Sequence, residues 1–233
     1  RQVVTGDSTR RSATAFAPAS VGNVGVGFDI LGHTVAALGD KVRATRRAEP
    51  GVAIRSITGT VDNLPLAAEK NTAGMAVLAL CRELSLPYGF DLDIEKGIPL
   101  GSGLGGSAAS AVAGIVAAAA LVDEPLERTE LLKFAMQGEA VASGSVHVDN
   151  IAPSLYGGLV LTVGIDNPFV KQIPVPDTIR CVLVHPHMVL PTREARAILS
   201  KSVPLSDVIW QQANLAGFLA GCFTNDIALI RES

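Results

Sequence analysis

Apolar and polar residues alternate in several separate stretches of this chain, which is the pattern of strands with one face against a core. The alternation predicts strands at 12–17, 38–45, 52–58 and 90–95. We expect the second and third of these strands to form a meander at the edge of a sheet. The Pro-Ala-Ser sequence after the first strand is expected to end it.

Apolar residues recur at helical spacing elsewhere, and each such run predicts a helix. One predicted helix begins after the candidate cap Asn71-Thr72. Four more helices are predicted at 108–122, 128–142, 191–196 and 206–223. A glycine pair at 157–158 begins a predicted strand that runs to Ile165, and a buried strand is expected at 180–185. Helices and strands therefore occur together in one chain of mixed class.

Prolines at 168, 174 and 176 predict a crossing into a second domain. A chain of 233 residues is long enough for one large or two modest domains. The sequence therefore predicts a first domain at 1–166 and a second at 167–233.

The stretch 98–120 joins a glycine-rich loop directly to an alanine-rich helix. Helix N-termini carry N–H groups without partners and partial positive charge, so such a junction favours an anion. The nucleotide P-loop pattern does not fit, because no lysine precedes Ser107. The dinucleotide fingerprint G-x-G-x-x-G fits literally, but no series of alternating strands and helices surrounds it. Close packing of small residues is the alternative explanation.

Composition narrows the classes of function. The chain is 48% hydrophobic and 4% aromatic, with a net charge of −3. A nucleic-acid partner is not expected, because that binding needs clustered Lys and Arg. The sequence predicts no membrane span and no signal peptide, and its three scattered cysteines indicate reduced thiols in the cytoplasm. Because it begins without methionine and stops after a helical run, we expect an excerpt of a longer chain.

Polar residues in otherwise small or apolar segments are candidates for a site. Asn23 and Asp29 lie in a glycine-rich segment, which an ordinary turn would also explain. Glu139 lies among apolar and small residues, where a carboxylate is costly unless it binds a cation or faces solvent. His147, Asp149 and Asn150 precede an apolar run, where either of the last two could instead be a helix cap.

Three motifs in order along the chain carry a family resemblance. They are the segment 99–109, reading PLGSGLGGSAA; the segment 18–29, reading PASVGNVGVGFD and followed by Leu31-Gly32; and the segment 138–153. On these motifs the chain resembles the GHMP small-molecule kinases, and within them the members that phosphorylate L-homoserine. The resemblance covers nearly the whole chain.

The resemblance implies an α+β, two-domain GHMP kinase fold. Its N-terminal domain would be similar to domain 2 of ribosomal protein S5, and its C-terminal domain would be ferredoxin-like and truncated. The implied ligands are ATP, Mg²⁺ and L-homoserine, with no nucleic acid or membrane as partner. The expected context is a cytoplasmic enzyme of threonine biosynthesis, with a homodimer as its candidate assembly.

The resemblance also implies roles for individual residues. Ser107 and Glu139 would hold the metal. Residues implied near the nucleotide are Asn71, Lys96, Pro99, Gly101, Ser102, Gly103, Leu104, Gly105, Gly106 and Ser107. Residues implied near the amino-acid substrate are Asn23, Asp29, His147, Asp149 and Arg196. The implied catalytic residues are Ser107, Glu139, Asp149 and Asn150.

The implied chemistry is direct, in-line transfer of the γ-phosphoryl group without a phosphoenzyme, resting on positioning and charge neutralisation. Asp149 could accept the hydroxyl proton or grip the substrate ammonium. Another GHMP kinase acting on mevalonate-type or sugar alcohols, and a catalytically incomplete nucleotide-binding module, stay as alternatives.

The chain departs from the family pattern at a few positions. Val148 stands where proline is usual, and Gly22 where alanine is common. The family's C-terminal glycine-rich motif and a second substrate-binding arginine are missing from these residues. We expect a chain ending at Ser233 to have weak or no kinase activity.

Overall fold

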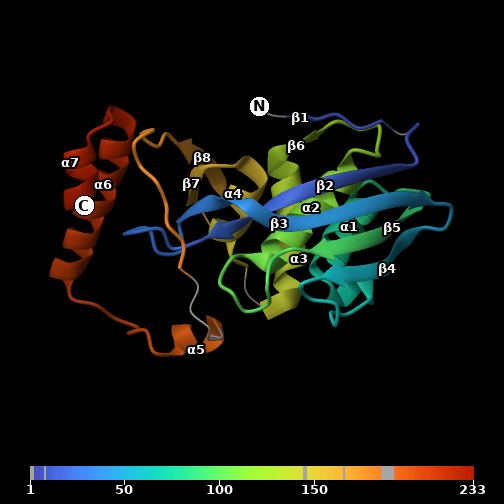
Figure 1. The fold of residues 1–233 in the computed structure, drawn as a ribbon, viewed down its shortest axis with the longest axis horizontal. Coiled ribbons are helices and arrows are strands. Elements are labelled where there is room, and N and C mark those ends of the chain that lie inside the picture. The colour runs from blue at the N-terminus through green and yellow to red at the C-terminus, as the bar shows by residue number, and fades with distance from the viewer. Residues whose placement is uncertain (1–2, 8, 144–145, 165, 185–191) are drawn as a thin grey trace.

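The computed structural model describes residues 3–7, 9–143, 146–164, 166–184 and 192–233. A mixed sheet forms one layer, and helices cover one of its faces (Figure 1). The final two helices lie at one end of the molecule, beyond the last strand pair of the sheet.

The strands fall into a six-stranded sheet and a separate two-stranded one. Their bounds are β1 Val3–Val4, β2 Ser12–Val21, β3 Leu31–Arg47, β4 Gly51–Gly59, β5 Gly89–Lys96, β6 Leu126–Glu127, β7 Leu159–Val163 and β8 Phe169–Ile173.

The α-helices comprise a group packed around the sheet and a C-terminal group. Their bounds are α1 Thr72–Glu83, α2 Gly106–Ala119, α3 Arg128–Ser143, α4 Val148–Tyr156, α5 Thr192–Ala197, α6 Leu205–Thr224 and α7 Ile227–Glu232. A short 3₁₀ turn, Ala68–Lys70, precedes α1.

The large sheet runs in the order β4-β5-β3-β7-β8, with β2 paired to β3. The predicted meander of the second and third strands is wrong, because β5 lies between β3 and β4 and pairs with both. The apolar side chains of β5, including Phe90, Leu92 and Ile94, are buried in the core. Pairing on both edges satisfies the backbone N–H and C=O groups of this buried strand, which outweighs the local hairpin.

The first strand also differs from the prediction. The Pro-Ala-Ser sequence does not end it, and β2 continues to Val21 with a shift of register between Pro18 and Ser20. Proline lacks a backbone donor and is tolerated at a bulge or on an edge strand. Among the described strands β2 pairs only with β3, so it is such an edge.

The buried strand predicted at 180–185 is wrong over its described part. Residues 180–184 form no strand and are exposed, with Val182 84% and Val184 81% accessible; His185 lies outside the described residues. Within the described ranges no strand pairs with this segment, and an apolar run cannot form a ladder without a partner.

The position of the proposed domain boundary, between 166 and 167, stays a prediction. It falls between β7 and β8, which pair antiparallel in the same sheet. The predicted helix at 206–223 is confirmed as α6.

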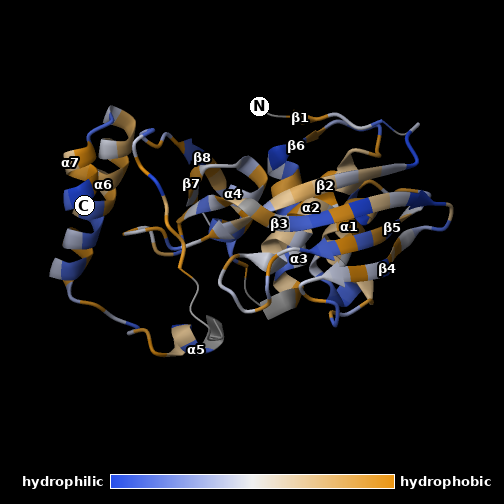
Figure 2. Cartoon of the chain, viewed as in Figure 1, coloured by the Kyte–Doolittle hydropathy of each residue, from blue (hydrophilic) through white to orange (hydrophobic). Residues whose placement is uncertain are grey.

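The core lies between the helices and the sheet. Hydropathy alternates along β3, β4 and β5, as Figure 2 shows, while α2 is apolar on nearly all sides. Small residues let these helices approach closely. A Cβ on Gly114 of α2 would lie 3.0 Å from the Cβ of Ala73 in α1. The predicted alanine-rich core helix is therefore confirmed as the central helix of the fold.

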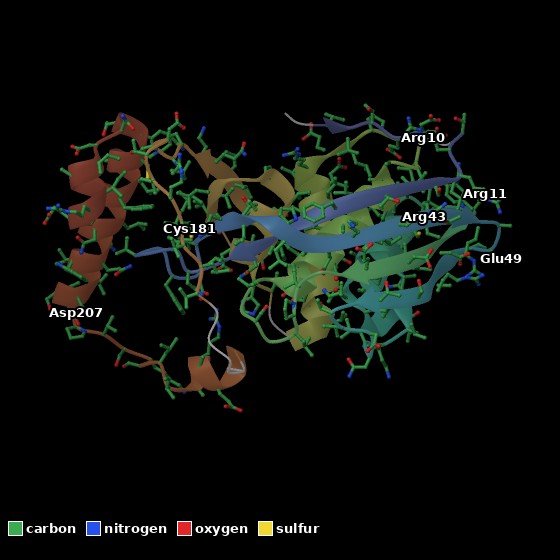
Figure 3. All side chains as sticks on the ribbon, viewed as in Figure 1. Arg10, Arg11, Arg43, Glu49, Cys181 and Asp207 are labelled. Atoms are coloured by element: carbon green, nitrogen blue, oxygen red, sulfur yellow. The ribbon has the colours of Figure 1, made fainter. Side chains whose placement is uncertain are left out.

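Charged side chains gather at the end of the sheet away from α6 and α7 (Figure 3). Arg10 pairs with Asp7 at 3.3 Å, and Arg47 pairs with Glu49 at the same distance. Basic and acidic groups are thus interspersed there. None of the helices in the described ranges is long and apolar enough to cross a membrane.

Candidate active site

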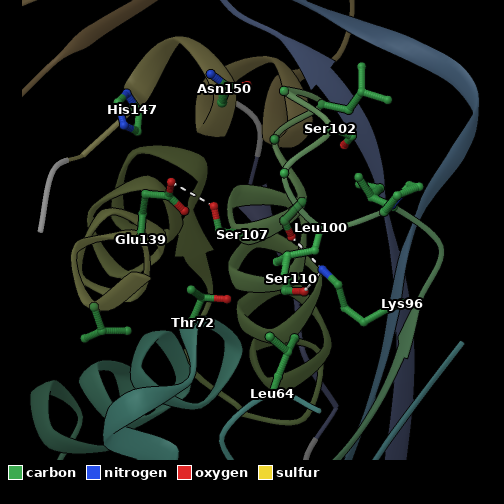
Figure 4. Close-up of a pocket in the computed structure, with 18 of the residues that line it drawn as sticks. Leu64, Thr72, Lys96, Leu100, Ser102, Ser107, Ser110, Glu139, His147 and Asn150 are labelled. Atoms are coloured by element: carbon green, nitrogen blue, oxygen red, sulfur yellow. Dashed lines mark hydrogen bonds between the residues drawn. The ribbon is translucent and has the colours of Figure 1, made fainter. Parts of the chain in front are cut away.

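A cavity of about 620 Å³ opens where the glycine-rich loop meets the helices (Figure 4). The loop, the end of β5, the start of α1, and parts of α3, α4 and α5 contribute to its wall. Candidate residues that line it are Asn23, Asn71, Lys96, Pro99, Gly101, Ser102, Gly103, Leu104, Gly105, Gly106, Ser107, Glu139, His147, Asn150 and Arg196. Asp29 and Asp149 are not among its lining residues. The fold therefore brings most of the predicted site residues to one cavity.

The glycine-rich loop has a backbone that only glycine adopts easily. Gly101, Gly103 and Gly105 all have positive φ, between 65° and 72°. Gly105 is the N-cap of α2, and a Cβ there would lie 2.3 Å from the Oγ of Ser20. The first N–H groups of α2 follow directly, without a capping side chain. This arrangement leaves backbone donors and the positive end of a helix at the cavity wall.

Glu139 faces the start of α2 from the neighbouring helix α3. The Ser107 hydroxyl donates to Glu139 Oε1 at 2.9 Å, while the buried Oε2 has no hydrogen-bond partner among the described residues. Glu139 is only 3% exposed, so the solvent-facing alternative is wrong. Gly138 lets α3 pack closely on α1, since a Cβ there would lie 2.4 Å from the Thr72 carbonyl oxygen.

Burial raises the pKa of the Glu139 carboxyl to about 7, and the Ser107 hydrogen bond and the Lys96 charge counter it only in part. A buried carboxylate with an unpaired oxygen is an unfavourable arrangement without a cation. The pair of Ser107 and Glu139 therefore supplies hard oxygen ligands that fit a magnesium ion.

Asp149 and Asn150 lie in the first turn of α4, and neither is its N-cap, so the capping alternative is wrong. His147 occupies that position, half-buried at the cavity wall. The Asp149 carboxylate is buried and accepts the Asn23 N–H at 3.1 Å. Burial, the largest cause, raises the pKa of this carboxyl. The Asn150 side chain accepts the Ser20 hydroxyl at 3.2 Å, which joins α4 to β2.

Asn23 and Asp29 shape the loop between β2 and β3. Both have positive φ, and the Asn23 side chain accepts the Asp29 N–H at 2.8 Å. The Asp29 carboxylate accepts hydrogen bonds from both terminal nitrogens of Arg196, and the bond from Nη1 to Oδ2 measures 3.0 Å. This paired carboxylate raises the pKa of the guanidinium. A carboxylate thus already occupies the fork of Arg196.

Two residues implied near the nucleotide have their polar atoms engaged within the protein. The Asn71 side chain caps α1, accepting from Ala73 and Gly74, and donates to the Pro65 carbonyl. The Lys96 ammonium is buried against Asp40, Ser110 and the Gly106 carbonyl. Both residues still line the cavity.

Sequence reasoning missed Asp40 and Ser110, which are buried beneath the glycine-rich loop. The sequence did contain a signal for Asp40, because a carboxylate within a predicted strand indicates a buried charge that needs a partner. Asp40, Lys96 and Ser110 lie 14 or more positions from one another along the chain, so their proximity depends on the fold.

Comparisons with known proteins place the chain in a family. Residues 71–158 match the family described as "GHMP kinases N terminal domain". A homoserine kinase from Xylella fastidiosa (strain M12) is 51% identical over 225 residues, which cover 96% of this chain and 68% of that protein. The chain belongs to the homoserine kinases of the GHMP family.

Two further relatives agree with this placement. A homoserine kinase from Chlorobium phaeobacteroides (strain BS1) is 40% identical, across 96% of this chain and 73% of that protein. The crystal structure of homoserine kinase from Cytophaga hutchinsonii is 43% identical with a TM-score of 0.88, covering 96% of this chain and 71% of that one. The predicted α+β GHMP kinase fold is confirmed, and the chain is an ATP-dependent small-molecule kinase.

Proposed function

We propose that this protein transfers the γ-phosphoryl group of ATP to the side-chain hydroxyl of L-homoserine, as a magnesium-dependent step in threonine biosynthesis. The observation that carries the proposal is the buried, half-unpaired Glu139 carboxylate bonded to Ser107 at the open N-terminus of α2. The names of relatives up to 51% identical support homoserine as the substrate.

The glycine-rich loop and α2 would hold the triphosphate. Backbone N–H groups from Gly103 to Ser107 and the helix dipole suit phosphate oxygens. Magnesium, when bound at Ser107 and Glu139, would neutralise charge on the β and γ phosphates. The nearby Asn71 and the stem of Lys96 would form the wall beside the nucleotide.

The amino-acid substrate would lie across the cavity from the loop, near Asn23, His147 and Arg196. The Arg196 fork suits a carboxylate, and the Asp29 carboxylate shows that its two terminal nitrogens can be engaged together. Substrate binding would then exchange Asp29 for the substrate carboxylate, which releases Asp29 for the substrate ammonium. Asn150, fixed by Ser20, would complete the wall between the two ligands.

The transfer forms a bond between the substrate oxygen and the γ-phosphorus as the bond to the β–γ bridging oxygen breaks. ADP leaves with the bridging oxygen, and the hydroxyl proton passes to solvent water. Asp149 is buried against the Asn23 backbone and does not line the cavity, which favours a positioning role over that of a base. Positioning and charge neutralisation then supply most of the catalysis.

Product identification tests this proposal. The protein is incubated with ATP, Mg²⁺ and L-homoserine, and ³¹P NMR follows the mixture. We expect one new phosphomonoester signal, matching O-phosphohomoserine, together with ADP. Formation of ADP and inorganic phosphate without the ester would contradict the proposal.

We also propose a cytoplasmic location and a homodimeric state. All three cysteines are described as free thiols, which fits a reducing compartment. The homodimer stays a prediction, and analytical ultracentrifugation would decide it.

A further inference from the structure

Asp40, in the middle of β3, is fully buried and binds the first residues of the glycine-rich loop. Its Oδ1 accepts the backbone N–H groups of Gly97 at 3.0 Å and Ile98 at 3.2 Å. The approach is close, since a Cβ on Gly97 would lie 2.1 Å from the carbonyl oxygen of Gly39. One carboxylate oxygen therefore fixes the point where the chain leaves β5.

Lys96 binds the other end of the same loop. Its buried ammonium donates to the Gly106 carbonyl at 2.8 Å, to the Ser110 hydroxyl at 2.8 Å and to Asp40 Oδ2. An ammonium has three donors, so all of them are used within the protein. Figure 4 shows Lys96 reaching toward Ser110 and the start of α2 from beneath the loop.

Ser110 closes the network from the next turn of α2. Its hydroxyl donates to Asp40 Oδ2 at 2.7 Å and accepts from Lys96. We define Asp40, Lys96 and Ser110 as the loop clamp. Through them the residues at 97–98 and at 106 are tied to one buried ion pair, while the glycines between them have little conformational restriction of their own.

We propose that the loop clamp is a positioning device for nucleotide binding, which holds both ends of the phosphate-binding loop at the spacing that the triphosphate requires. The residues act through the loop backbone. This inference rests on the nucleotide-binding part of the proposed function.

Energetics favours positioning over stability as the role of this ion pair. Burying two charges costs desolvation that their attraction seldom exceeds, and well-packed apolar replacements are often as stable. An apolar pair, however, cannot accept the N–H groups of Gly97 and Ile98 or donate to the Gly106 carbonyl. Stability and loop position can therefore be separated by mutation.

The test compares the double variant Asp40→Leu/Lys96→Met with the parent protein. Urea unfolding measures stability, and titration calorimetry with ADP and Mg²⁺, without homoserine, measures nucleotide affinity. We expect an unfolding midpoint close to that of the parent and ADP affinity weaker by about tenfold or more, because the loop loses its fixed ends. The KM for ATP should rise similarly, while the KM for L-homoserine stays near the parent value.

A second variant covers the case in which the double variant does not fold. Ser110→Ala keeps both charges and removes only the bridging hydroxyl. Its matched control is Ser154→Ala, a buried serine of α4 whose hydroxyl donates to the Pro18 carbonyl at 2.9 Å. We expect about threefold weaker ADP binding for the first and unchanged binding for the second.

Two results would overturn the inference: a folded double variant that binds ADP like the parent, or equal ADP affinity in the two serine variants. Because the ADP titrations contain no homoserine, a failure of the homoserine kinase proposal would leave this test readable. Parent protein that binds ADP without phosphorylating homoserine would count against the substrate alone.

Discussion

At the scale of single residues, the Glu139 carboxylate lies in an environment that disfavours its charged form when no cation is bound. It is buried, one oxygen is unpaired, and its pKa is raised to about 7. The raised pKa means that the folded state holds a proton which the unfolded chain releases as the pH rises from 4.5 to 7. The stability of the unliganded protein therefore falls as the pH rises from about 4.5 to about 7, and it stays at the lower value above pH 7.

Glu139→Gln should therefore separate stability from activity. Without magnesium or nucleotide, we expect it to raise the free energy of unfolding by about 3 kcal/mol at pH 8 and by less than about 1 kcal/mol at pH 5. Kinase activity should fall by about 100-fold or more with loss of the metal ligand. Urea unfolding at both pH values and a coupled ADP assay measure the two effects. Equal stability changes at the two pH values would contradict the burial argument.

Asp149→Asn tests the role of the second buried carboxylate. Because Asp149 Oδ2 holds the Asn23 backbone and lies outside the cavity lining, we expect kcat within about tenfold of the parent and a raised KM for L-homoserine. Steady-state kinetics with saturating ATP measures both constants. A fall in kcat of about 100-fold or more with an unchanged KM would instead identify Asp149 as the base.

At the scale of elements, the junction between the glycine-rich loop and α2 determines what the cavity can bind. The left-handed glycines keep side chains away from the phosphate position, and α2 presents its N-terminus there. The site residues predicted from this stretch share one cavity wall because they are close in sequence. Glu139 was inferred from its apolar sequence neighbours and Asp149 from the polar residues beside it, and both from the family resemblance, since nothing local joins them to the loop.

Gly105→Ala should impair this junction more than Gly103→Ala does. Both positions have positive φ, which costs alanine about 1–2 kcal/mol. Only at Gly105 would the new Cβ also meet Ser20 and Asn150, because nothing lies within 4 Å of a Cβ on Gly103. We expect the larger rise in the KM for ATP, and the lower unfolding midpoint, for Gly105→Ala. Indistinguishable variants would show that contact with Ser20 is unimportant.

At the scale of the whole molecule, one sheet supports the site from several directions. Its strand β3 carries Asp40, β5 leads into the loop, and α2 packs across both. The sequence predicted most of these elements but not their pairing. The insertion of β5 between β3 and β4, and the exposure of 180–184, depend on contacts between distant segments that alternation alone cannot specify.

Leu92→Ala and Val182→Ala test this architecture at a buried and an exposed position. Leu92 is fully buried in β5, so we expect a loss of about 2–5 kcal/mol in the free energy of unfolding. Val182 is 84% exposed, and its replacement should change that free energy by no more than about 0.5 kcal/mol. A loss at Val182 as large as that at Leu92 would show that this segment is buried in the working protein.

The most direct test of the central claim is the kcat/KM of the full-length polypeptide with ATP, Mg²⁺ and each of four alcohols: L-homoserine, L-serine, mevalonate and galactose. The account predicts ADP formation with L-homoserine at least about 100-fold more efficient than with any other, since a site built to bind a substrate's polar groups rejects analogues that lack them. Preference for mevalonate or galactose, or nucleotide binding without turnover of any alcohol, would contradict it.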